Sequence, residues 1–167
     1  MTTLPANAGH APIAELVRAY MAAEYRWQHK GEWHDLRIGL QAPGLELLYA
    51  DADSFGMVSA WNPRSVERDE RTNRDADVLL QQDLAATGLP FLAAFGSALD
   101  RSWREPGWVV IGMAVEDFDA LAVRYGQLGT LWWTRGKAGQ LRMDAARPVG
   151  FGADEHIAWL QPCPASA

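Results

Sequence analysis

The stretch that most constrains the fold is residues 55–61, FGMVSAW, which is apolar at odd and even positions alike except for Ser59. Successive side chains of a strand point to opposite faces, so this pattern predicts a strand in a sheet that is covered on both sides. Pro63 ends the strand, because proline lacks the amide hydrogen that a sheet requires and restricts Asn62 before it. We therefore expect other elements to pack on both faces of this strand.

The next element is a polar helix. Apolar residues at helical spacing predict it over residues 69–87, and Gly88 and Pro90 follow as stop signals. Four residues near its start are suitable N-caps, namely Ser65, Asp69, Thr72 and Asn73.

The rest of the central region predicts strands over residues 91–96, 108–115 and 130–135, with a helix over 117–125 that Asp117 caps and Gly126 ends. Residues 55–135 thus follow the order strand, helix, strand, strand, helix, strand. This order predicts an α+β fold with a ferredoxin-like βαββαβ core, in which both helices lie on one face of an antiparallel sheet.

Two flanking regions extend this core. An amphipathic pattern begins at Pro12 and continues through Trp27 to Gly31, which predicts one helix. A hairpin is predicted over residues 36–50, with its turn at Pro43-Gly44, and a final hairpin joins 130–135 to a strand at 140–143. We expect a single domain over residues 1–167, with the core at 55–135, the N-terminal helix and hairpin at 12–50, and the C-terminal strand and tail at 139–167.

Composition excludes several classes of partner. The net charge of -6 and the isoelectric point near 5.1 disfavour nucleic acids and anionic membranes as partners.

Location and cofactors are addressed by individual residues. The single cysteine, Cys163, indicates a reducing compartment, and the first 16 residues lack the cationic and apolar parts of a signal peptide, so we expect a cytoplasmic protein. His29, Glu32, His34 and Asp35 lack the spacing of a metal site, and no nucleotide-binding motif is present, so we expect no metal and no cofactor.

The predicted topology brings four polar segments to one edge of the sheet. They are the turn at residues 62–65, the first turn of the helix after it, the loop before the strand at 108–115, and the Gly126-Gln127 turn. Amides, a hydroxyl and a carboxylate that meet near a helix N-terminus can bind a ligand through directional hydrogen bonds. The same side chains can also serve the backbone of their own turns.

Several short motifs in this region resemble a known family. The segments AWNPRS, ERTNRD, REPGWVVIG and RYGQ occur in order over residues 60–127. In their order and spacing they resemble a bacterial domain-of-unknown-function family, domain of unknown function 3293, which is marked by N-P-x-S and F/Y-G-Q elements. The resemblance implies a bacterial origin and a shared site, but no reaction. It implies characteristic positions at Asn62, Pro63, Ser65, Asn73, Glu105 and Gln127.

We therefore predict that a small polar or anionic molecule binds at this edge. The predicted ligand-binding residues are Asn62, Ser65, Arg71, Asn73, Glu105 and Gln127. Two other functions are open. One is a hydrolase at the same edge, with Glu105 as the general base, and whether the protein is an enzyme is left undecided. The other is a protein-interaction or homodimerisation module that uses a sheet edge or face.

Overall fold

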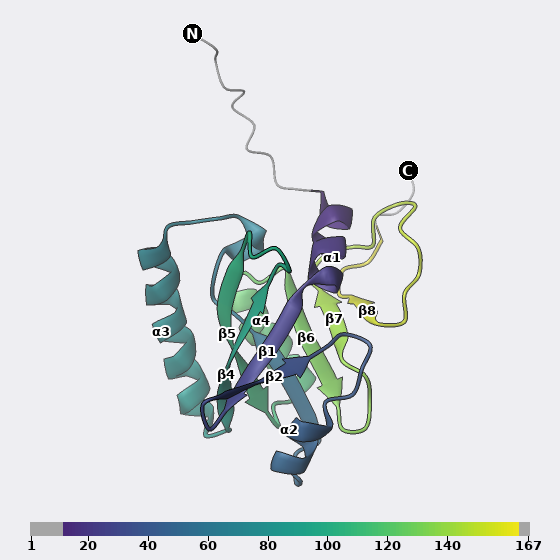
Figure 1. The fold of residues 1–167 in the computed structure, drawn as a ribbon. Coiled ribbons are helices and arrows are strands. Elements are labelled where there is room, and N and C mark those ends of the chain that lie inside the picture. Colours follow the sequence, from purple (N-terminus) through teal and green to yellow (C-terminus); the bar gives the residue numbers. More distant parts are fainter. Residues whose placement is uncertain (1–11, 164–167) are drawn as a thin grey trace.

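The computed structural model describes residues 12–163, which form a mixed α+β structure with one eight-stranded sheet (Figure 1). Residues 1–11, on which the signal-peptide prediction partly rests, and residues 164–167, the end of the predicted C-terminal tail, lie outside the described residues. No helix in the described range is long and apolar enough to cross a membrane.

Four antiparallel strands form the centre of the sheet. They lie in the order β4 (Phe91–Ser97), β5 (Arg104–Ile111), β3 (Ser54–Val58) and β6 (Gly129–Thr134). The helix α3 (Glu70–Thr87) connects β3 to β4, and α4 (Val115–Arg124) connects β5 to β6. The α+β class and these six central elements agree with the sequence prediction.

Both faces of β3 are covered, as its apolar pattern predicts. On one face, Val58 packs with Leu80 and Leu84 of α3 and with Phe118 of α4. Gly56 faces the same side, and a Cβ atom there would lie 2.4 Å from the ring of Phe118, so α4 packs directly on the strand backbone. These helices form one layer against the sheet (Figure 1).

On the other face, Phe55 and Met57 belong to a larger core that includes Val17 of α1 (Ile13–Ala22) and Leu45 of α2 (Pro43–Leu48). The sheet curves around this core. Its outer strands β1 (Glu24–His29) and β2 (Glu32–Leu36) pair with each other, and β1 also pairs with β4. The chain after β2 meets the start of β7 at a bridge between Ile38 and Gly139.

The N-terminal prediction was wrong in two places. The first helix ends at Ala22, and the residues predicted to continue it form β1 instead. Tyr25 and Trp27 are both buried, two residues apart on one strand face, and they make β1 a strand between β2 and β4. The predicted hairpin over 36–50 is also wrong, because the hairpin is β1–β2 and Pro43 begins the helix α2.

Smaller differences concern element ends. Among the candidate caps of α3, Asp69 is the one used, since its carboxylate accepts a hydrogen bond from the amide of Thr72. Asp117 does not cap α4, which begins two residues earlier, and β5 begins at Arg104 within the predicted loop. The strand β7 (Gln140–Met143) pairs with β6 as predicted, and β8 (Ile157–Trp159), which was not predicted, runs parallel to β7.

Candidate functional site

The turn that follows β3 has an unusual backbone. Asn62, Arg64 and Ser65 all have positive φ angles, 44°, 57° and 58°, and Pro63 begins a short 3-10 turn, η1 (Pro63–Ser65). Residues other than glycine seldom adopt this conformation, and asparagine is among those that tolerate it best. Such strained positions persist only where neighbouring contacts hold them. This strained turn is therefore held in place by its contacts with neighbouring residues.

The first set of contacts joins Asn62 to Asn73 and Arg68; we call these three residues the turn network. The Asn73 side chain accepts from the Asn62 amide at 2.9 Å and donates to the Asn62 side chain at 2.8 Å. The Arg68 guanidinium donates to Asn73 Oδ1 at 2.6 Å and to the Ala60 carbonyl at 2.7 Å. Asn73 is 2% exposed, so these bonds form away from water. The turn network closes the turn onto the start of α3.

Glu105 contacts this network from the neighbouring strand β5. Its Oε1 atom accepts a hydrogen bond of 2.8 Å from Asn62 Nδ2. Burial raises the pKa of the Glu105 carboxyl, and the bond from Asn62 opposes that rise in part. No arginine, lysine or histidine among residues 12–163 forms an ion pair with Glu105. Glu105 is thus a largely buried carboxyl group held by an amide and not by a counter-ion.

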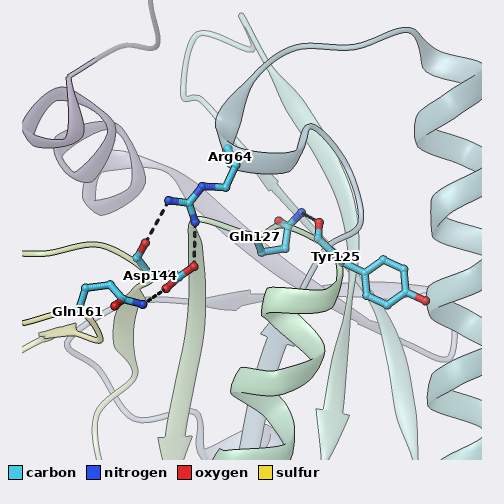
Figure 2. A network of polar contacts seen from close by, with 5 residues as sticks. All are labelled: Arg64, Tyr125, Gln127, Asp144 and Gln161. Carbon is cyan, nitrogen blue, oxygen red and sulfur yellow. Dashed lines mark hydrogen bonds and ion pairs between the residues drawn. The ribbon is translucent and has the colours of Figure 1, made fainter.

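The Gly126-Gln127 turn lies on the other side of the strained turn. Gln127 Nε2 donates to the Trp61 carbonyl at 3.0 Å and to the Tyr125 carbonyl at 3.3 Å, and the second of these bonds is drawn in Figure 2. The Arg64 amide donates to the Gly126 carbonyl at 2.7 Å. A Cβ atom on Gly126 would lie 2.8 Å from Pro63 Cβ, and its φ angle is 66°, so only glycine fits there without strain. The two turns are therefore packed against each other.

The side chain of Arg64 binds the chain after β7. Its guanidinium donates to the Asp144 carboxylate at 2.8 Å and to the Asp144 carbonyl at 3.2 Å, and Gln161 donates to the other carboxylate oxygen at 2.7 Å (Figure 2). These contacts connect the strained turn to the C-terminal part of the described chain. The Arg64 guanidinium is thus already paired with a carboxylate of the protein itself.

Two tyrosines from the N-terminal elements complete the arrangement. The Tyr20 hydroxyl of α1 forms a hydrogen bond with the Ser65 hydroxyl, and the Tyr25 hydroxyl of β1 donates to the Tyr20 carbonyl at 2.6 Å. Burial raises the pKa of both phenols, and the negative charge of Glu105 raises them further. Both tyrosines line the same cavity as Glu105.

Between these groups lies a partly enclosed cavity of about 50 Å³, which we call the Glu105 cavity. Apolar side chains of β3, β6 and β7 form part of its wall. The polar and aromatic residues that line it are Tyr20, Tyr25, Ser59, Trp103, Glu105, Gln127 and Thr130. The volume exceeds that of one water molecule but is far below the roughly 300–1,000 Å³ of a typical ligand pocket, so only the head group of a small molecule would fit inside.

The six predicted site residues have different positions relative to this cavity. Glu105 and Gln127 line it. Asn62 and Ser65 lie one contact behind the wall, since they bond to Glu105 and Tyr20, and Asn73 lies behind Asn62. Arg71 is exposed and forms no hydrogen bond or ion pair that the structure records within residues 12–163. Five of the six positions are thus connected, and Arg71 is not.

The sequence interpretation missed Tyr20 and Tyr25 as site residues. Both fall in the stretch that was assigned to a single covering helix, so neither was expected near Glu105. The alternation of Tyr25 and Trp27 with the polar residues Glu24, Arg26 and Gln28 is the signal for a strand that could have indicated β1. With β1 in place beside β4, Tyr25 would have been expected near the end of β5.

Fold and cavity together define a mixed α+β protein whose strained turn and neighbouring strand ends surround a small cavity with apolar walls and a few polar groups. Within it, residues 58–129 match the family described as "Protein of unknown function (DUF3293)", which confirms the resemblance drawn from the sequence motifs. No curated protein and no solved structure matches the chain. The matched region contains the turn network, Glu105 and Gln127, whereas Tyr20 and Tyr25 lie outside it.

Proposed function

We propose that the protein binds a small polar molecule in the Glu105 cavity. The observation that carries this proposal is a buried carboxyl group with one free oxygen: Glu105 Oε1 is bound by Asn62, while Oε2 accepts no hydrogen bond from the described residues. The Gln127 side chain also has one unused oxygen: its Nε2 atom donates two hydrogen bonds, whereas its Oε1 atom accepts none within residues 12–163. Neither oxygen is among the fully buried polar atoms that lack a partner in the described residues, so both are accessible from the cavity, where a ligand would bond to them.

The surroundings of the cavity support binding and not simply a loosely packed core. Its walls come from α1, β1, the ends of β3 and β5, and the start of β6, so groups far apart in sequence converge on one small volume. The strained turn beside it is held by three separate sets of contacts, to Asn73, to Gly126 and to Asp144. Strain maintained in this way is common beside functional sites.

A ligand screen on the full chain tests this proposal. We expect at least one member of a defined set of amino acids, amines, sugars, nucleosides and small carboxylates to raise the melting temperature and to shift the NMR signals of the Gln127 side-chain amide. In Gly96→Ala the added methyl group would lie 3.1 Å from the Tyr25 ring and would narrow the cavity, so binding should weaken. Gly152→Ala is the matched control, because no atom lies within 4 Å of the added carbon. Undiminished binding to Gly96→Ala would place the ligand elsewhere.

A second candidate is acid–base catalysis at the same position. Burial raises the pKa of Glu105 towards the range in which a carboxyl group can both accept and donate a proton near neutral pH. A hydrolase of this kind would use Glu105 to take a proton from the attacking water. Turnover of p-nitrophenyl esters or phosphates that is lost in Glu105→Gln would favour it, and the rate would rise with pH as Glu105 ionises.

The finer features of the fold belong to the same proposal. The strand order β4-β5-β3-β6, with helices between β3 and β4 and between β5 and β6, supports a ferredoxin-like core. A bacterial origin is supported by the family resemblance, and a cytoplasmic location by the single cysteine.

A further inference from the structure

Two hydrogen-bond acceptors on the wall of the Glu105 cavity, Glu105 Oε2 and Gln127 Oε1, have no partner among the described residues. Several donors of the wall are used within the protein: Tyr25 donates to the Tyr20 carbonyl, Gln127 Nε2 to two carbonyls, and Ser59 to the Pro106 carbonyl at 2.7 Å. The Thr130 hydroxyl and the Trp103 indole N–H also line the cavity and have no recorded partner within residues 12–163. The Tyr20 and Ser65 hydroxyls bond to each other. A ligand that bonds to Glu105 Oε2 and Gln127 Oε1 must donate hydrogen bonds to them.

The charge around the cavity points the same way. No lysine or arginine from the described part of the chain lines it. Arg104, the residue next to Glu105, lies over the Phe95 ring at 4.1 Å, because neighbouring residues of a strand face opposite sides. Arg64 and Arg68 are bound by Asp144 and Asn73. Glu105 thus lacks the positive partner that a buried carboxylate normally requires.

The third observation is the aromatic wall. The rings of Tyr20, Tyr25 and Trp103 line the cavity beside Glu105. Aromatic faces attract cations through their negative π-electron density, and aromatic walls beside a carboxylate are suited to ammonium groups. An anionic ligand, in contrast, would meet Glu105 with no arginine or lysine in the wall to offset the repulsion.

We infer that the Glu105 cavity binds the cationic end of an organic amine, with Glu105 as the counter-ion and the rings of Tyr20, Tyr25 and Trp103 as its aromatic wall. The small volume selects a primary ammonium head group, and the open side of the cavity admits the remainder of the molecule. This inference rests on the proposed function, because it names the class of ligand for the same cavity. It differs from the anionic ligand that the sequence analysis named as one alternative.

Three probes that share a propyl tail test the inference: propylammonium, 1-propanol and butyrate. Each is titrated into the ¹⁵N-labelled full chain at neutral pH, and the Gln127 side-chain amide and the Trp103 indole N–H are followed. We expect propylammonium to bind about tenfold more tightly than 1-propanol, as a charge-assisted hydrogen bond allows, and butyrate not to bind. Equal binding of all three, or preference for butyrate, would overturn the cationic assignment and leave ligand binding by the cavity intact. Absence of binding by all three would overturn the assignment too, and the broader ligand screen would then decide separately whether the cavity binds anything.

A matched pair of variants isolates the charge of Glu105. Glu105→Gln keeps the oxygen that accepts from Asn62 and removes the charge, so the preference for propylammonium over 1-propanol should disappear. Glu116→Gln makes the same change at an exposed position in the first turn of α4 and should keep the preference. If Glu105→Gln retains the preference, Glu105 is not the counter-ion.

A measurement on the unmodified protein keeps the test independent of whether the variant folds. The Glu105 carboxyl carbon is titrated by ¹³C NMR with and without propylammonium. A cation that binds the carboxylate must lower the pKa of Glu105, because ligand and proton compete for the same group. An unchanged pKa at saturating propylammonium would overturn the inference.

Discussion

Two groups of polar residues lie side by side at the end of β3 and differ in where their hydrogen bonds go. In the turn network of Asn62, Arg68 and Asn73, the side chains bond mainly to one another and to nearby backbone atoms. On the cavity wall, Glu105 and Gln127 each have one oxygen that no described residue uses. The comparison shows that residues of the same chemical type either hold the fold or present a site. Their partners decide which.

The largest effect is expected in the turn network. Asn73→Ala removes four hydrogen bonds from a residue that is 2% exposed, and leaves the Asn62 amide without its acceptor. Each buried polar group left unpaired costs about 1–3 kcal/mol, so we expect a loss of about 3 kcal/mol in the free energy of unfolding, measured by urea denaturation. Gln82→Ala removes an exposed amide from the same helix and should cost less than about 0.5 kcal/mol. Equal costs for the two would show that the turn network does not stabilise the fold.

The second-largest loss of stability is expected at the contact between the Pro63 turn and the Gly126-Gln127 turn. Gly126→Ala would place a methyl group 2.8 Å from Pro63 Cβ in a residue with a φ angle of 66°, and we expect a loss of about 2–3 kcal/mol from crowding and backbone strain together. Gly136 also has a positive φ angle, 75°, but has no atom within 4 Å of an added Cβ. Gly136→Ala should therefore lose only the strain contribution, about 1 kcal/mol. Thermal unfolding of both variants measures the difference, and its absence would mean that Pro63 moves aside without cost.

A smaller change, an increase in the free energy of unfolding, is expected when Glu105 on the cavity wall is replaced by glutamine. Burial raises the pKa of Glu105 in the folded state above its value in the unfolded chain. The stabilising contribution of the protonated carboxyl is complete below the unfolded pKa, near 4.3, and is lost as pH rises through the folded pKa. Glu105→Gln cannot ionise, so near pH 7 we expect it to be more stable than the wild type, by on the order of 1 kcal/mol.

The pH dependence supplies the control for this variant. Near pH 4 the difference in unfolding free energy between Glu105→Gln and wild type should largely vanish, because both side chains are then neutral. Denaturation curves at several pH values measure it. A variant that is less stable than the wild type at every pH would show that Glu105 belongs with the turn network as a structural residue.

The smallest effect is expected at Arg71. This side chain is exposed and lies outside the connected group, so Arg71→Ala should change the unfolding free energy by less than about 0.5 kcal/mol. It should also leave propylammonium binding unchanged. A clear loss of binding in a calorimetric titration would restore Arg71 to the site, as the sequence predicted, and would require the ligand to extend to the start of α3.

Much of the central region could be predicted because its patterns are long or sharply ended. The helix α3 has several turns of helical periodicity, a capping aspartate and a terminal glycine, and β3 has the abrupt stop at Asn62-Pro63. The N-terminal region could not be predicted in the same way. Tyr20, Met21 and Trp27 continue a helical face, while Tyr25 and Trp27 fit a strand face, and short windows do not separate the two periods. Residues 24–29 form a strand because they pair with β4 and β2, and these pairings are not visible in the local sequence.

The sequence by itself determined which segments reach the end of β3, because strand order and the short turns at Asn62-Pro63 and Gly126 leave few ways to connect them. It also supplied Asn62, Asn73, Glu105 and Gln127 to that end. Only the tertiary structure decided which of their polar atoms are used and which are free. Hydrogen bonding and burial depend on distances between residues that lie tens of positions apart, such as Tyr20 and Ser65, or Asn62 and Glu105. No local pattern in the chain specifies those distances.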